Sequence, residues 1–253
     1  MVTGLDINPS SVLGPCTGCA MGKHPRAPFP SSGIIAKEVL DRLHMDLQGP
    51  FDNSHAGYRY ALAVVDDCCH KGWKEYLKKK SESSPKIQEL ITQLETRTGH
   101  KVKIVRSDGG GEFITKELQD WFKSKGITHE KSAPNTPQQN GVAERFNRTT
   151  HEHALALLHD AGMQKSFWVE AHEYASKVRN RSPTKVLRHR HTTPDELFYG
   201  RKPDVSALRI FGSKCHVRIH PDHRKKLDPH SVNGIFCGFE CNSKAYKIWV
   251  PSK

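Results

Sequence analysis

The sequence predicts a mixed α/β fold, in which a five-stranded sheet with flanking helices is followed by a small β-barrel-like module. The first reason is the order of the elements: three strands, a helix, a strand, a helix, a strand and a long helix follow one another between residues 42 and 162. The second is composition, because 253 residues with 36% apolar and 8% aromatic side chains allow a packed core. The third is a run of short apolar β segments after a basic stretch near the end.

Five segments of the core have the pattern of strands. In RLHMDLQ, apolar and polar residues alternate with the period of a half-buried strand, and Asp46 falls on the polar side. YRYALAVVDD predicts a more deeply buried strand, and GWKEYLKK a third strand in a hairpin. The five segments are residues 42–48, 58–67, 72–79, 101–108 and 127–133.

Helices are expected between and after these strands. Residues 84–98 have apolar side chains at helical spacing. Thr115 predicts the start and Gly126 the end of a shorter helix. After the turn-rich loop PNTPQQNG, an apolar stripe predicts a long helix that ends at Gly162, and a further helix covers residues 166–181. This order permits an RNase H-like sheet.

We therefore expect four parts. They are a loop-rich N-terminal segment, the α/β core, a basic linker that contains proline, and a small β domain similar to Src-homology-3 domains, at residues 1–36, 37–181, 182–204 and 205–253.

Nearly all of the net positive charge lies at one end of the chain. Residues 177–253 carry 17 Lys and Arg against 6 Asp and Glu, whereas residues 1–176 carry 22 against 21. A basic segment joined to a neutral body favours a polyanion partner, and nucleic acid in particular, over a surface that is basic only for solubility. No apolar run is long enough to span a bilayer, and no signal peptide pattern is present. Seven cysteines, two of them adjacent, are not typical of a secreted disulfide framework, so we expect an intracellular chain.

Three acidic residues stand where a metal ion could be held. Asp46 is on the polar side of the first strand, Asp108 is at the end of the fourth, and Glu144 is at the start of the long helix. Converging carboxylates suit two Mg²⁺ ions, which prefer hard oxygen ligands. Each acid alone is more often a cap, a turn residue or a solvated first-turn acid, so the prediction depends on the combination.

The blocks around these acids resemble the signature blocks of retroelement integrases of the copia-type LTR-retrotransposon branch. They are HMDLQGP, VRSDGGGEF and APNTPQQNGVAERFNRT. The second and third acids are separated by 144 − 108 − 1 = 35 residues, the spacing of that family. Further similarity runs through FWVEAHEYASKVRNRSPTK and KKLDPHSVNGIFCGF, so that the resemblance covers nearly the whole chain.

The resemblance implies an enzyme, a polynucleotidyl transferase and endonuclease of the D-D-35-E type, with Asp46, Asp108 and Glu144 as catalytic metal ligands. Its expected reactions are 3′-end processing and strand transfer of element DNA into target DNA, with two Mg²⁺ or Mn²⁺ ions. The implied partners are element and target DNA, other copies of the chain, and a reverse transcriptase as polyprotein neighbour, with RNA as a further candidate and no membrane. The implied location is the nucleus, after assembly in cytoplasmic particles.

Residues beside Glu144 resemble the DNA-facing loop of the family. They are Gln138, Gln139, Asn140, Arg145 and Arg148. Ordinary loop and helix-surface polarity is an equally good interpretation of these residues.

The N-terminal segment resembles part of a His-His-Cys-Cys zinc module. Cys16 and Cys19 have the C-x₂-C spacing of a zinc knuckle, but the paired histidines expected before them are absent. We therefore expect an incomplete Zn²⁺ site and a chain cut from a longer Pol polyprotein. The alternatives to an integrase are a catalytically inactive nucleic-acid-binding remnant of such an element and a nuclease of the same fold.

Overall fold

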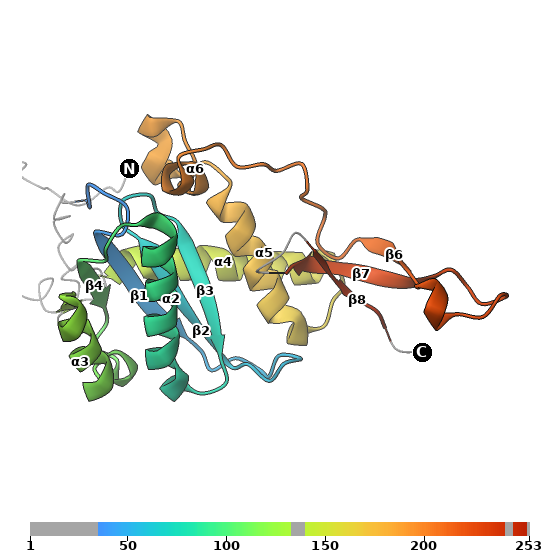
Figure 1. The fold of residues 1–253 in the computed structure, drawn as a ribbon, viewed down its shortest axis with the longest axis horizontal. Helices are drawn as coiled ribbons and strands as arrows, with labels where there is room; N and C mark the ends of the chain where they lie inside the picture. Colours follow the sequence, from blue (N-terminus) through green and yellow to red (C-terminus); the bar gives the residue numbers. More distant parts are fainter. Residues whose placement is uncertain (1–34, 133–139, 241–244, 252–253) are drawn as a thin grey trace, which may run out of the picture. The chain divides into compact units, whose positions relative to one another are not determined.

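The computed structural model divides the chain into two compact units, residues 1–34 and 35–253, and describes residues 35–132, 140–240 and 245–251. Within the second unit, five strands form one mixed sheet in the order β3-β2-β1-β4-β5 (Figure 1). The strands β1, β2 and β3 are antiparallel, and β4 and β5 extend the sheet in parallel with β1. They comprise Arg42–Gln48, Tyr60–Asp66, Gly72–Leu77, Ile104–Ser107 and Thr128–Lys131. The predicted RNase H-like sheet with flanking helices is confirmed.

Alternation along β2 gives the sheet two different faces. Leu62 and Val64 point into a cluster with the helices α2 (Ser83–Thr98) and α3 (Lys116–Lys125). Ala63 and Val65 point to the opposite face, where they contact α4 (Gly141–Asp160). Figure 1 shows α2 and α4 on opposite sides of the sheet. The smaller side chains on the α4 side let that helix approach the strands closely.

Short 3₁₀ turns and caps fix the ends of these helices. The turn η1 (Lys80–Glu82) leads directly into α2, and η2 (Gly111–Phe113) follows β4. Thr115 caps α3 by accepting a hydrogen bond from the Leu118 amide, and Gly126 ends it in the left-handed conformation. Both α3 boundary residues agree with the sequence prediction, because Thr and Gly are favoured at these positions for local backbone reasons.

The helix α5 (Trp168–Asn180) follows the 3₁₀ turn η4 (Lys165–Phe167) and packs on α4. It also contacts a three-stranded antiparallel sheet in the order β6-β7-β8. The strands are Lys214–Arg218, Ser231–Phe239 and Tyr246–Trp249, with η6 (Pro221–His223) between the first two. Phe211 and Phe236 bury their rings in the same cluster as Trp168, so this sheet shares a core with the helices.

The segment 182–204, predicted as a linker, contains η5 (Lys185–Arg190) and α6 (Pro194–Tyr199). Thr193 caps α6 by accepting a hydrogen bond from the Glu196 amide at 3.2 Å. Asp195 forms a buried ion pair with Lys71, and the Phe198 ring lies 5.1 Å from the Trp73 ring. These contacts bind the segment to the core.

Candidate active site

Strand register brings Asp46 and Asp108 to the same edge of the sheet. In the parallel pair β1–β4, Arg42 pairs with Ile104, an offset of 104 − 42 = 62 residues. The same offset, continued two residues past the pair His44–Arg106, puts Asp46 beside Asp108, since 46 + 62 = 108. Neighbouring strands lie about 4.8 Å apart, so the two carboxylates emerge close together.

The glycines after Asp108 fit this placement. The Gly110 amide donates a hydrogen bond to Oδ1 of Asp108 at 3.1 Å. A Cβ at position 110 would lie 3.0 Å from that oxygen and from the Glu112 carboxylate, so a larger residue would crowd both acids. At Gly109 and Gly111 an added Cβ would meet nothing within 4 Å.

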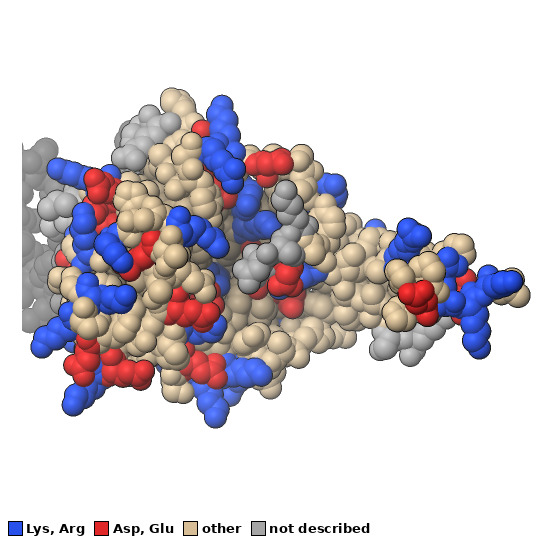
Figure 2. Space-filling view, viewed as in Figure 1, with Lys and Arg blue, Asp and Glu red and all other residues tan. Residues whose placement is uncertain are grey.

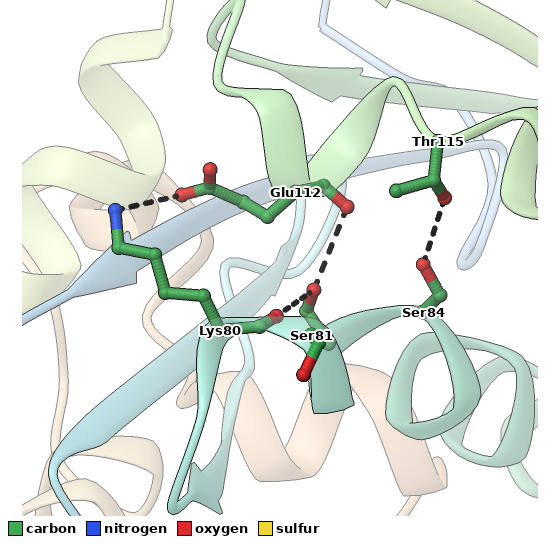
Figure 3. Close-up of a pocket in the computed structure, with 6 residues that line it drawn as sticks. Lys80, Ser81, Ser84, Glu112 and Thr115 are labelled. Atoms are coloured by element: carbon green, nitrogen blue, oxygen red, sulfur yellow. Dashed lines mark hydrogen bonds and ion pairs between the residues drawn. The ribbon is translucent and has the colours of Figure 1, made fainter.

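A pocket lined by polar residues lies beside the chain just after these glycines (Figure 3). The Lys80 amine lies 3.7 Å from the Glu112 carboxylate, and the Ser84 hydroxyl lies 2.9 Å from the Thr115 hydroxyl. The cavity has a volume of about 240 Å³ and lies at the start of α2. Its contacts join Glu112 and Thr115 to the start of α2, and none of the three predicted catalytic acids lines it.

Glu144 is brought to the site by the packing of α4. The helix buries Ala143 and Phe146 on the sheet, which leaves Glu144 exposed in its first turn. Gly72 makes this packing possible, because a Cβ there would lie 2.2 Å from the Phe146 ring. The Asn180 side chain holds the Gly72 backbone by accepting from its N–H at 3.1 Å and donating to its C=O at 2.7 Å.

The pKa shifts of Asp46 and Glu144 show that the negative charges of neighbouring acids act on both carboxyl groups. Burial raises the pKa of Asp46, a hydrogen bond from Asn147 opposes that rise, and the charge of Asp108 raises it further. Burial also raises the pKa of Glu144, followed by the charge of Asp46, whereas Arg145 lowers it and Asp108 raises it again. Asp46 is therefore affected by the negative charge of Asp108, and Glu144 by the charges of both Asp46 and Asp108.

The donor set fits a hard divalent cation. Three mutually repelling carboxylates supply oxygen ligands, and a cation between them would relieve the repulsion. In the described part of the chain, however, no three His, Cys, Asp or Glu side chains are already arranged as a metal-holding group. The residues that would hold Mg²⁺ or Mn²⁺ are Asp46, Asp108 and Glu144.

The other predicted site residues differ in where the structure places them. Cys16, Cys19, Gln138 and Gln139 lie outside the described residues. Asn140 is only 1% exposed and donates its amide to the Met45 carbonyl at 2.8 Å, so it ties the start of α4 to β1 rather than facing outward.

Arg145 and Arg148 are both exposed on α4, on the part of the helix that carries Glu144. They therefore keep the access to solvent that a contact with DNA requires.

Sequence reasoning missed the side chains that support Asp46. Asn147 donates to Oδ2 of Asp46 at 2.8 Å, and Lys74 donates to Oδ1 of Asn147 at 3.0 Å. The signal for Asn147 was its position three residues after Glu144, on the same side of the helix. Lys74 gave no such signal, because its position depends on the pairing of β2 with β3.

Known protein families match two parts of the chain. Residues 36–137 match the integrase core domain, and residues 213–253 match the retroviral polymerase SH3-like domain. The core match ends before Glu144.

Curated relatives and a solved structure extend the similarity over most of the chain. The chain is 36% identical over 240 residues to the retrovirus-related Pol polyprotein from transposon TNT 1-94 of Nicotiana tabacum, and 32% identical over 240 residues to that from transposon RE1 of Arabidopsis thaliana. These alignments cover 94% and 95% of this chain but only 18% and 16% of the polyproteins. A chain of the simian T-cell lymphotropic virus intasome, solved in complex with the PP2A regulatory subunit B56 gamma, has the same fold. Its TM-score is 0.58 at 16% identity, over 93% of this chain and 84% of that one.

The sheet order, the flanking helices and the family match define an RNase H-like integrase core. The chain contains an integrase core domain and a retroviral SH3-like domain, and over most of its length it is similar to the retrovirus-related Pol polyproteins of copia-type plant transposons. It spans less than a fifth of the length of the curated relatives that it matches.

Proposed function

We propose that this chain carries out metal-dependent 3′-end processing and strand transfer of retrotransposon DNA. The observation that supports the proposal is that the register of β1 and β4 continues to Asp46 and Asp108, and that the charges of both acids act on Glu144 in the first turn of α4. Bound divalent cations would supply activation of an attacking hydroxyl and stabilisation of the leaving oxygen of a phosphodiester. The three acids would hold those cations at the sheet edge.

The remaining parts of the site would hold DNA. Arg145 and Arg148 are exposed next to Glu144 and would contact phosphates near the reacting bond. The C-terminal sheet adds exposed basic side chains on β6 and on the connection between β6 and β7, visible as blue atoms in Figure 2. They are Lys214, Arg218, Lys225 and Lys226.

The proposal extends to assembly and location. Two DNA ends and a target must be held together, so we expect several copies of the chain to act as one complex. We expect this complex to act on DNA in the nucleus. None of the helices in the described part of the chain has the length and hydrophobicity that crossing a bilayer requires.

A strand-transfer assay tests the function. With a labelled oligonucleotide that mimics an element end, and with Mn²⁺, the chain should nick the end and join it to target DNA. Asp46→Asn, Asp108→Asn and Glu144→Gln should each abolish both reactions, because each removes one anionic ligand. Asp120→Asn, which changes an exposed acid of α3, is the matched control and should keep activity. Joining by any of the three site variants at the rate of the unmodified chain contradicts the assignment. DNA binding without cleavage by the unmodified chain would favour the inactive remnant.

A further inference from the structure

A row of facing residues crosses the sheet beside the proposed metal site. Asp46 on β1 pairs with Ala63 on β2, and Ala63 pairs with Lys74 on β3. Residues directly opposite one another across neighbouring strands point to the same face. Lys74 therefore lies on the α4 face with Asp46, separated from it only by the methyl group of a fully buried alanine.

Asn147 on α4 bridges the two ends of this row. Its Oδ1 accepts a hydrogen bond from the Lys74 amine at 3.0 Å, and its Nδ2 donates to Oδ2 of Asp46 at 2.8 Å. The same amine donates to Oε1 of Gln48 at 3.3 Å. The lysine thus contacts two neutral amide oxygens, and the Asn147 amide links it to Asp46 by hydrogen bonds.

The chemistry of the amide gives Lys74 a specific task. An asparagine side chain has an accepting oxygen and a donating nitrogen, so a half-turn exchanges the two. A protonated lysine only donates hydrogen bonds, and in that form it fixes the oxygen of Asn147 on its own side. The nitrogen must then face Asp46, whereas the flipped amide would direct its oxygen at a carboxylate.

Placing the lysine here has an energetic cost. Burial lowers the pKa of Lys74 to about 7, which indicates that its charged form is poorly solvated. A methionine of similar length would avoid that cost, so stability alone does not account for a lysine at this position.

We propose that Lys74 is a positioning residue, which orients the Asn147 amide so that Asp46 is held in place for a divalent cation. The inference rests on the proposed function, because it assumes that Asp46 is a metal ligand. It adds residues of β3 and of the second turn of α4 to the support of the site.

Manganese binding by the whole chain tests the inference. Lys74→Met should weaken Mn²⁺ affinity, measured by isothermal titration calorimetry, by about 10- to 100-fold, the range seen when partners of metal ligands are removed. Its melting temperature should be unchanged or higher. Lys74→Arg keeps a donor and should stay within a few-fold of the unmodified chain. Lys78→Met changes an exposed lysine just past β3 and should alter neither quantity.

A double-mutant cycle identifies the route through Asn147. If Lys74 acts through that amide, Lys74→Met should cost little further affinity once Asn147→Ala is present. Affinity equal to that of the unmodified chain in Lys74→Met, a full additional loss in the double variant, or a loss that parallels a lower melting temperature would overturn the inference.

The variant Asp46→Asn distinguishes a failure of the Lys74 inference from a failure of the proposed function. Loss of Mn²⁺ binding in Asp46→Asn with normal binding in Lys74→Met overturns only the role of Lys74. Normal binding in Asp46→Asn overturns the proposed metal site and the inference with it.

Discussion

The neighbouring groups determine which residue types fit at single positions of the candidate site. Position 110 requires a glycine because a Cβ there would lie only 3.0 Å from the carboxylates of both Asp108 and Glu112. Asn140 is polar and buried because it satisfies the Met45 carbonyl at the point where α4 begins. Gly110 thus leaves room for the Asp108 carboxylate, and Asn140 joins the start of α4 to the strand that carries Asp46.

A buried histidine next to the site sets a pH dependence of stability. His172 is 1% exposed, its Nε2 lies 3.1 Å from Nδ1 of His151, and its ring meets the Trp168 ring edge-on at 5.4 Å. Burial, followed by the charges of Lys74 and His151, lowers the pKa of His172 to about 2. The folded chain therefore keeps this imidazole neutral across the range in which an unfolded histidine takes up a proton.

The sign of the effect follows from that difference. As pH falls below about 6.5, the unfolded chain binds a proton that the folded chain does not bind, so the free energy of unfolding decreases by up to about 1.4 kcal/mol per pH unit from this group. His172→Phe should give a shallower decrease between pH 6.5 and 4 in urea unfolding, whereas His100→Gln, at an exposed histidine, should match the unmodified chain. Identical slopes for His172→Phe and the unmodified chain would show that this histidine is not held neutral.

The elements around the site are placed by close contacts between them. The strand β3 and the helix α4 meet where Gly72 faces the Phe146 ring, and the position of Glu144 depends on that contact.

Gly72→Ala tests how firmly α4 is positioned. The added methyl group would lie 2.2 Å from the Phe146 ring, so the helix or the ring must move. Overpacking of this kind costs about 1–3 kcal/mol of stability. Thermal unfolding should show the loss, and Gly72→Ala with Phe146→Leu should recover part of it. Gly111→Ala places a methyl group in open space and is the control. Unchanged stability in Gly72→Ala would mean that α4 is free to shift.

The sequence predicted elements where local rules decide them. The first strand has the predicted bounds because its alternation is strict, and α3 has the predicted ends because Thr115 and Gly126 suit its caps. The fourth strand is shorter than predicted, Ile104–Ser107, because only that part pairs with β1 and β5. The helix α6 was missed because contacts with the core stabilise it, among them those of Asp195 and Phe198.

The candidate site residues were predicted from similarly local features. Asp46 and Asp108 follow from strand parity and strand ends, and Glu144 follows from family spacing. Lys74 and Asn147 could not be predicted, because they meet Asp46 only through the register of three strands and the seating of α4.

At the scale of the whole molecule, charge is divided between a nearly neutral core and a basic end. The proposed DNA grip of the C-terminal sheet predicts binding that depends steeply on salt, with a log–log slope of about −0.9 per phosphate neutralised. Replacing Lys214, Arg218, Lys225 and Lys226 with glutamine should make that slope shallower in an anisotropy titration across a salt series.

A second variant with the same net charge controls for the loss of four cations. It replaces exposed basic residues of α2 and α3 with glutamine, at Arg97, Lys116, Lys123 and Lys125. If the C-terminal sheet grips DNA, the control should keep the slope of the unmodified chain. Equal slopes in the two variants would assign the salt dependence to net charge alone.

The claim on which the account depends is that Asp46, Asp108 and Glu144 together hold divalent metal. Anomalous diffraction from crystals of the whole chain soaked in Mn²⁺ tests it most directly. We predict anomalous density within coordination distance of all three carboxylates, and none at that position in Asp108→Asn crystals under the same soak. Manganese bound elsewhere, with this edge of the sheet empty at saturating Mn²⁺, would contradict the claim.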